Sequence, residues 1–336
     1  MAAVKPGACM TRRVWPISDH FDGKHFFNTA VSGRHNPTFG SLLKMLRTPR
    51  SPWPRSVRNK GVPRLDAALT DDDIAVTFVN HATFLIQVGG LAILTDPVWS
   101  ERASPVPWTG PRRVRPPGVA FGDLPKIDLI LLSHNHYDHF DLPTLRRLRQ
   151  AVSPTIAVAA GDAPLAERIG FTDVRELDWW DETPVGDALK ITFVPAQHFS
   201  ARGPFDRRRS LWGGYMIESL GRRIYFGGDS GYSTHFSDIG SRLGRPDIAM
   251  LGIGAYEPRW FMAPIHMNPA EAVRAHKDIG ARYSIGMHFG TFQLTPEPID
   301  QPQADLKAAL SQSGIPDGEF VTLHEGETRI YRVPAV

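Results

Sequence analysis

The chain has 336 residues, of which 42% are hydrophobic; this composition can bury a substantial core and excludes an intrinsically disordered protein. The formal net charge is +3, a mild basic bias that suits phosphate groups or a membrane surface and is too weak to indicate a nucleic acid as partner. The single cysteine, Cys9, excludes an internal disulfide framework, so a metal site in this chain has to be built from His and Asp.

Targeting and membrane-spanning segments are not evident in the sequence. No apolar run approaches the roughly 18 residues that a membrane-spanning helix needs. The N-terminus, MAAVKPGACMTRRVW, has no sustained apolar core and does not resemble an ordinary signal peptide. We therefore expect a cytoplasmic protein, and the basic bias leaves room for peripheral contact with a membrane.

The N-terminal part differs from the rest of the chain. Residues 1–70 are rich in Pro, Arg and aromatic residues without clear periodicity, and we interpret them as an irregular arm packed on a main domain at 71–336. Within the arm, 41–48 predicts a short helix that Pro49 stops. One face of this helix gathers leucines beside basic residues: Leu42, Leu43 and Leu46, with Lys44, Arg47 and Arg50 nearby. Docking of the leucines on the protein's own core is the favoured interpretation, and a basic amphipathic helix on a membrane is the alternative.

The main domain opens with hairpins. One or two strands are predicted over 74–88, followed by a Gly-Gly turn and a returning strand at 91–94. His81 and Asp96 lie in this region. Lone residues of these types are more often structural, although Asp96 could orient a metal-bound histidine from behind.

Strands and helices then alternate, which predicts the α/β class. Helices are expected after three start signals: Asp141 followed by Pro143, Asp162, and Asn268 with Pro269 and Glu271 in its first turn. The remaining strands are predicted at 129–132, 156–159, 191–194, 213–218, 223–226, 248–253, 283–287 and within 321–331. Strongly polar residues follow several strand ends, which is where ligand sites of α/β sheets lie.

The densest group of such residues follows the buried strand at 129–132. In an extended segment, residues two apart point the same way, so His134 and His136 can present two imidazoles to one point. Asp138 and His139 come where the chain turns toward the next helix, and they can face a second point nearby. Imidazole and carboxylate are ligands of zinc and of similar divalent metals. Three His and one Asp within six residues make a plain polar loop a poor alternative.

Three later polar residues complete a candidate ligand set. His198, Asp229 and His288 each follow a predicted strand, and His198 or Asp229 would be interpreted as structural if it stood alone. A hydrolytic metal site commonly has three or four protein ligands plus water, so seven ligands are too many for one ion. They suit two ions, roughly 3.5–4 Å apart, that share a carboxylate.

These residues carry a resemblance to a known family. The run H-x-H-x-D-H at 134–139, with the later His198, Gly-Gly-Asp229 and His288, resembles the metallo-β-lactamase superfamily over approximately residues 70–335. A narrower similarity is to the N-acylphosphatidylethanolamine-hydrolysing phospholipase D group. It rests on SHNHYDH at 133–139, GAYEPRWFM at 254–262, HMNPAEAV at 266–273 and MHFGTF at 287–292.

The resemblance implies a fold and a role for each matching residue. The fold is a four-layer αββα sandwich with the metals at one sheet edge. The implied first zinc is bound by His134, His136 and His198, the second by Asp138, His139 and His288, and Asp229 bridges the two. The substrate-facing histidine of the family corresponds to His266, while the glutamine that precedes it in the animal enzymes is Ile265 here.

The function that follows is a zinc-dependent phosphodiesterase of the phospholipase D type, with another divalent metal as the alternative cofactor. A hydroxide between the metals would attack the phosphorus of an N-acylphosphatidylethanolamine-like phospholipid, giving phosphatidic acid and an N-acylethanolamine. Asp138, Asp229 and His266 are the residues expected to take part in catalysis. The expected substrate contacts are Tyr137, Tyr256, Arg259 and His266, although an internal ion pair of Arg259 with Glu257 is an equal alternative for that arginine.

Two other functions remain open from the sequence. One is a hydrolase of the same fold that acts on a lactone or on a soluble phosphodiester. The other is a metal-binding regulatory module without turnover, which the complete set of seven convergent ligands disfavours.

Overall fold

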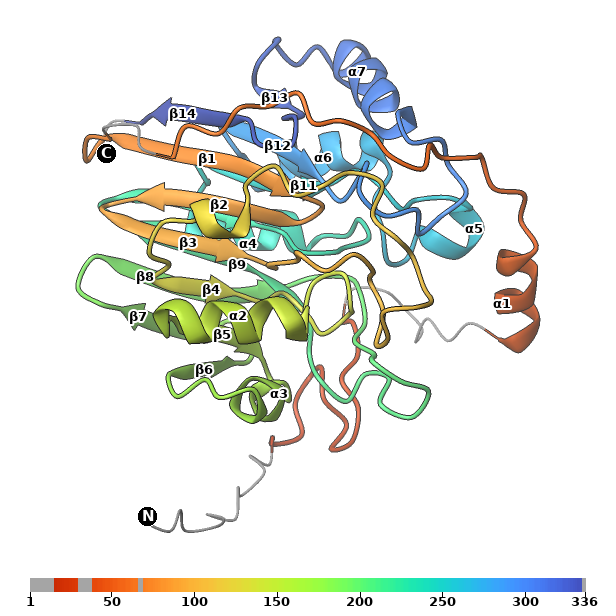
Figure 1. Cartoon of the computed structure of the whole chain (residues 1–336), viewed down its shortest axis with the longest axis horizontal. Helices are drawn as coiled ribbons and strands as arrows, with labels where there is room; N and C mark the ends of the chain where they lie inside the picture. The colour runs from red at the N-terminus through yellow and green to blue at the C-terminus, as the bar shows by residue number, and fades with distance from the viewer. Residues whose placement is uncertain (1–14, 30–37, 66–68, 334–336) are drawn as a thin grey trace.

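The architecture is a sandwich of two β-sheets with helices on both outer faces (Figure 1). This computed structural model describes residues 15–29, 38–65 and 69–333. Each sheet has seven strands, and the two sheets share a large apolar core between them. The predicted four-layer αββα arrangement is therefore confirmed.

The first sheet begins with antiparallel hairpins and continues with parallel strands. A strand from the far end of the sequence adds antiparallel to its first hairpin. In spatial order the strands are β14 (Thr328–Arg332), β1 (Asp73–Asn80), β2 (Thr83–Val88), β3 (Leu91–Thr95), β4 (Leu129–Leu131), β5 (Thr155–Ala159) and β6 (Val174–Leu177).

The second sheet repeats this plan, with an antiparallel meander followed by parallel strands. In spatial order its strands are β13 (Phe320–Val321), β12 (Tyr283–Met287), β11 (Ile248–Gly252), β10 (Arg222–Phe226), β9 (Gly213–Ser219), β8 (Leu189–Pro195) and β7 (Glu182–Val185). Parallel neighbours run in the same direction, so within each sheet their carboxyl ends lie at the same edge. The carboxyl ends of the two sets can therefore meet at one edge of the sandwich.

Helices cover the outer faces of the two sheets. The first sheet carries α2 (Leu142–Val152) and α3 (Ala163–Arg168), while on the second sheet α6 (Pro269–Ile279) contacts β11 and is flanked by α4 (His235–Leu243) and α7 (Gln301–Ser313). Two short helices, α1 (Phe39–Leu46) and α5 (Arg259–Met262), lie together on the right-hand side of Figure 1. A 3₁₀ turn spans Phe121–Asp123.

The period-two alternation of the strands explains the layers. In β4 and the residue after it, Leu129 and Leu131 belong to the core between the sheets, while Ile130 and Leu132 belong to the core under α2 and α3. A strand that is apolar on both faces suits this doubly covered position. Because the residues after Leu132 leave both cores at the sheet edge, the polar run that follows is free to form a site.

Most predicted elements are present, with shifted ends. The asparagine-capped helix has the full capping box between Asn268 and Glu271. Asp141 and Asp162 do stand at helix starts, but neither side chain caps its helix. Asp141 instead accepts hydrogen bonds from the backbone of Ser100, and Asp162 from the side chain of Asn135. The two carboxylates therefore anchor loops at the site edge rather than helix ends.

The described parts of the N-terminal arm lie on the main domain. Phe26 is buried as part of the larger apolar core, and the Trp53 indole donates to the Glu297 carbonyl. The helix predicted at 41–48 is α1, which docks through Met45. The expectation that its leucines pack on the core is wrong for Leu42 and Leu43, which are 44% and 36% exposed, because the helix is turned so that Met45 faces the protein.

Other statements about the arm stay predictions. The division of the chain at residue 70 stays a prediction, Cys9 lies outside the described residues, and the side chain of Leu46 is likewise not described. Within the described ranges, every helix is too short or too polar to cross a bilayer.

Candidate metal centre

The polar residues that follow the strand ends come together at one edge of the sandwich. The loop after β4 brings His134, His136, Asp138 and His139 from the first sheet. The loops after β8, β10 and β12 bring His198, Asp229 and His288 from the second sheet. The seven predicted ligands thus meet at the junction of the two sheets, on the side that carries α1 and α5 (Figure 1).

The first group consists of three imidazoles facing one another. His134 Nε2 and His136 Nδ1 lie 2.8 Å apart, and His198 Nε2 lies 3.2 Å from the same His136 nitrogen. The other ring nitrogens of two of them are fixed from behind: His134 Nδ1 lies 2.9 Å from the Ser133 hydroxyl, and His198 Nδ1 donates to the Ile265 carbonyl. These outer contacts orient each ring so that its free nitrogen points into the site.

The second group consists of Asp138, His139 and His288. Asp138 Oδ2 lies 3.6 Å from His139 Nε2 and 3.5 Å from His288 Nε2. His139 is held from behind by Asp96, whose Oδ2 accepts from His139 Nδ1 at 2.6 Å. The predicted orienting role of Asp96 agrees with this contact, and Asp96 also accepts from the backbone and hydroxyl of Ser133.

Asp229 lies between the two groups. Its Oδ2 is 3.2 Å from Nε2 of both His139 and His288, and 3.6 Å from His198 Nε2. The chain reaches this position through Gly228, which has φ +56° and would place a Cβ 2.7 Å from the Cβ of Ser133. Only glycine fits there, because both the backbone conformation and the close approach exclude a side chain.

Charge in the site is distributed unequally. Burial lowers the pKa of the first-group imidazoles, to about 3 for His136 and about 4 for His198. In the second group burial opposes the charged form, but neighbouring carboxylates, Asp229 first, outweigh it and raise the pKa of His139 well above its usual value and that of His288 to about 9. The first group is therefore neutral near pH 7, whereas the second holds protons against its carboxylates.

The donor set fits two divalent ions. Tetrahedral zinc with ligand bonds of about 2.0–2.1 Å places its ligand atoms about 3.3–3.5 Å apart, close to the separations described above. Three buried atoms that point into the site have no hydrogen-bond partner among the described residues: Asp229 Oδ1, His139 Nε2 and His288 Nε2. Buried polar atoms are rarely left without a partner, so these are suited to metal ligation. The assignment of all seven as ligands stays a prediction.

Of the predicted substrate contacts, His266 lies beside the candidate ligands, whereas the two tyrosine hydroxyls are hydrogen-bonded to other parts of the protein. His266 lies in the site, with its Nε2 4.0 Å from Asp229 Oδ2. The hydroxyl of Tyr137 donates to the Arg202 carbonyl, and that of Tyr256 donates to Asp305. Contact of these two tyrosines with substrate stays a prediction.

Arg259 forms an internal ion pair, as the alternative interpretation held, but with a different partner. Its guanidinium contacts Glu271 Oε2 at 2.7 Å and the His266 carbonyl at 2.9 Å. Glu257, the expected partner, instead accepts from the backbone amide of Arg259. The reason is geometric: α5 turns the side chain of Arg259 toward the first turn of α6, where Glu271 belongs to the capping box.

Sequence reasoning missed the contribution of His81. It was interpreted as a lone structural residue, yet its Nε2 lies 3.0 Å from Asp138 Oδ2 and it joins the second group of potential ligands. The available signal was its place at the turn between two buried strands, where a histidine is an unusual choice.

Comparison with known proteins identifies the family. The model of the Beta-lactamase superfamily domain matches residues 92–289, which is more than half of the chain. The chain belongs to the metallo-β-lactamase superfamily. The chain is similar in sequence to N-acyl-phosphatidylethanolamine-hydrolyzing phospholipase D 1 of Caenorhabditis elegans. The two are 38% identical over 271 residues, which cover 77% of this chain and 76% of the relative.

Two further similar proteins bear on the chemistry and on the fold. A metal-dependent hydrolase of Methanopyrus kandleri is 30% identical over 75% of this chain and 98% of its own length. The solved structure of a metallo hydrolase from Ignicoccus hospitalis superposes with a TM-score of 0.59 at 20% identity, covering 78% of this chain and 100% of that one, which supports the fold alone. The protein is thus a metal-dependent hydrolase of the metallo-β-lactamase superfamily.

Proposed function

We propose that the protein is a two-metal phosphodiesterase of the phospholipase D type that hydrolyses N-acylphosphatidylethanolamine-like phospholipids. The observation that carries this proposal is the position of Asp229 Oδ2, which lies within 3.2–3.6 Å of imidazole nitrogens from both groups and so can be shared by two ions. The relative from Caenorhabditis elegans, named for this reaction, supports the choice of substrate. Zinc is the proposed metal, because the donor set is imidazole and carboxylate.

The proposed chemistry divides between the ions and the chain. Ions held by the two groups supply positive charge beside the phosphate and lower the pKa of the attacking water. Asp229 keeps the two groups at a fixed separation, and Asp138 contributes a carboxylate to the second. His266 presents a ring at the edge of the site. Burial lowers its pKa well below the usual value, so it meets the substrate as neutral imidazole, which can donate one hydrogen bond and accept another.

An apolar cluster beside His266 supports a lipid substrate. Ile265, the residue that replaces the glutamine of the animal enzymes, is buried with Phe261 and Met262, and Met45 of α1 packs against them. The side chain of Ile265 therefore cannot offer a polar contact, while its carbonyl holds His198. An apolar cluster directly behind His266 favours acyl chains at this edge of the site over a small hydrophilic phosphodiester.

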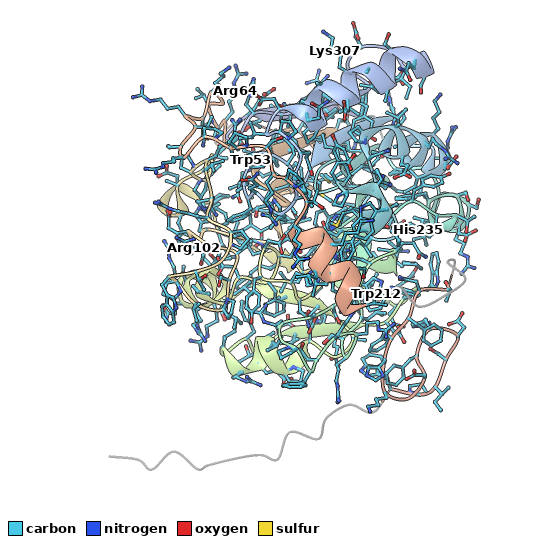
Figure 2. All side chains as sticks on the ribbon, turned by 90° about the vertical axis from the view of Figure 1, so that its right-hand side faces the viewer. Trp53, Arg64, Arg102, Trp212, His235 and Lys307 are labelled. Carbon is cyan, nitrogen blue, oxygen red and sulfur yellow. The ribbon has the colours of Figure 1, made fainter. Side chains whose placement is uncertain are left out.

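The surface next to this cluster supports peripheral contact with a membrane. Leu42 and Leu43 of α1 are exposed, as is Trp260 of α5 at 48%, and the Lys44 ammonium lies 4.6 Å from the centre of the Trp260 ring. The view in Figure 2 looks onto α1 and shows it at the front of this face. Exposed leucine and tryptophan beside basic residues suit the interface of an anionic bilayer.

A product assay with isotope labelling tests the proposal. Zinc-loaded protein in ¹⁸O-water is given N-acylphosphatidylethanolamine vesicles, a lactone and a soluble phosphodiester, with Asp229→Asn as the inactive control. Attack on phosphorus predicts one ¹⁸O atom in phosphatidic acid and none in the N-acylethanolamine. Turnover of the lactone alone would replace this proposal with a lactonase, and absence of turnover on all three would favour a regulatory module.

A further inference from the structure

His81 occupies an unusual place at the centre of the sandwich. It stands in the turn between β1 and β2, is 1% exposed, and has φ +49°, a left-handed conformation that is uncommon for residues other than glycine. The pairing of the two strands shifts register between Phe78 and Asn80, immediately before it. Irregular backbone of this kind persists where contacts with the surrounding structure hold it in place. The contacts of His81 should therefore explain its conformation.

Three hydrogen bonds hold His81, two to members of the second group of candidate ligands and one to the loop that follows His288. Its side-chain Nε2 donates to Asp138 Oδ2 at 3.0 Å, and its carbonyl accepts from the backbone amide of His288 at 2.8 Å. Its own backbone amide donates to the Thr291 hydroxyl, three residues beyond His288. One residue thereby joins a ligand of the first sheet to a ligand loop of the second. No other hydrogen bond of His81 is found in the part of the chain that the structure describes.

We propose that His81 is a positioning residue that holds Asp138 and His288 in place and so sets the affinity of the second metal position without affecting the first. The inference rests on the two-metal site of the proposed function but not on its substrate. Its physical basis is that outer partners fix ligand geometry before the ion arrives, and their loss lowers metal affinity about 10–100-fold.

The geometry favours a hydrogen-bond donor over an eighth ligand. His81 Nε2 is nearer to Asp138 Oδ2 than either histidine of the second group is, at 3.0 Å against 3.5 and 3.6 Å. A ring nitrogen that carries the donated proton has no lone pair to offer a metal in that direction. The donor contacts one carboxylate oxygen and so restricts the rotation of the Asp138 carboxylate.

The first group lacks these connections. His134 is oriented by Ser133, and His198 by the Ile265 carbonyl, at the opposite side of Asp229. Removal of the His81 side chain therefore leaves the supports of the first group intact. The proposal therefore predicts weaker binding at the second metal position alone, whereas a general loss of stability would weaken both positions.

The test is a metal titration of three variants and the parent protein. His81→Leu removes the hydrogen-bond donor at similar volume, and His81→Gln keeps a side-chain N–H. His276→Leu is the control. His276, on α6, is also buried, but its hydrogen bond is to Ser284 on β12 and not to a candidate ligand. Metal-free protein is titrated with Co²⁺, with the visible d–d absorbance and equilibrium dialysis as readouts and a thermal melt to verify folding.

For His81→Leu we expect a first equivalent bound as in the parent and a second bound about 10–100-fold more weakly. His81→Gln should fall between the two, and His276→Leu should match the parent at both equivalents. At saturating Co²⁺ the spectra of His81→Leu and the parent should coincide, because the ligands are unchanged.

Several results would overturn the proposal. A folded His81→Leu protein with an unchanged second equivalent would remove the positioning role, and equal weakening of both equivalents would assign His81 to the whole fold. A changed spectrum at saturation would make it a ligand instead. If His81→Leu does not fold, the second equivalent of His81→Gln decides between the same outcomes. A parent protein that binds one ion only would instead refute the two-metal site itself.

Discussion

The metal centre and the surface formed by α1 and α5 are neighbours that are built in opposite ways. In the centre the candidate ligands are buried, apart from the half-buried His136, and most are held from behind, as His139 is by Asp96. On the surface Leu42 and Trp260 are exposed, and the Trp260 ring contacts the Lys44 ammonium and the ring of Phe261. Chemistry that requires fixed distances is supported by rigid strand ends, whereas adhesion to a fluid surface requires only exposed area and charge.

This difference can be tested by substitutions that act on one region and leave the other unchanged. The centre should respond steeply to the loss of single atoms. The surface should respond only in proportion to area and charge, and only when a bilayer is present.

The largest effect is expected from Asp229→Asn. The change keeps the volume and removes the charge that both groups share, so turnover of any substrate should fall by more than about 100-fold, because even residues that only orient ligands are worth 10–100-fold. Elemental analysis should find about two ions per chain in the parent protein and at least one fewer in the variant. A parent stoichiometry near one at full activity would contradict the shared-carboxylate scheme.

Asp96→Asn should have the next largest effect. The amide cannot accept from His139 Nδ1 and from both Ser133 donors at once, so metal affinity should fall about 10–100-fold while the seven ligands remain. Competition with a chromogenic chelator measures this. Asp173→Asn, a carboxylate on the surface, is the matched control and should bind metal as the parent does.

The pH dependence of metal binding separates the two groups further. In the metal-free protein the pKa of His288 is raised to about 9, so its stabilising contribution is complete below pH 6.5 and is lost as the pH rises through 9. An ion has to displace this proton and the one held by His139, whose pKa is also raised, so its affinity should rise by at least about tenfold per pH unit between 7 and 9. Calorimetry in buffers of different ionisation enthalpy should show proton release, and a pH-independent affinity would mean that His288 is not displaced.

The smallest effect on the metal centre should come from Leu42→Glu combined with Leu43→Glu. Each glutamate removes exposed apolar area and adds a negative charge, worth about 1 kcal/mol near an anionic bilayer, so vesicle binding should weaken and do so less at high salt. Turnover of a soluble phosphodiester and the melting temperature should not change. Normal co-sedimentation of the well-folded variant would show that α1 is not the membrane contact.

The same contrast explains how far the sequence could predict the molecule. The ligand set could be found because chemistry restricts it: His134 and His136 are two apart after a strand, and few other patterns have that form. The role of His81 could not be found in this way. Its partner Asp138 is 57 residues away, and the two meet only when the turn after β1 folds against the loop after β4. For the same reason the sequence suggests Glu257 as the alternative ion-pair partner of Arg259, whereas the structure pairs it with Glu271.

The sequence does not predict β6, β7, α4 or α7, because the residue patterns of these segments are weak signals for a strand or a helix. β6 (Val174–Leu177) and β7 (Glu182–Val185) are edge strands with charged residues or a proline, so their alternation is weak. α4 contains Gly240, and α7 buries only Pro302, Leu306 and Ala309 along thirteen residues. Tertiary contacts rather than propensity decide such segments.

The spread of the ligands along the chain determines when the centre can exist during biosynthesis. His134 is made early, but the set is complete only after His288 has left the ribosome and β12 has joined the second sheet. A nascent chain therefore offers a metal ion at most an incomplete set of ligands. For the proposed centre, metal acquisition is then a late step that acts on the assembled sandwich, and we expect cells short of metal to accumulate folded apoprotein that binds metal after purification.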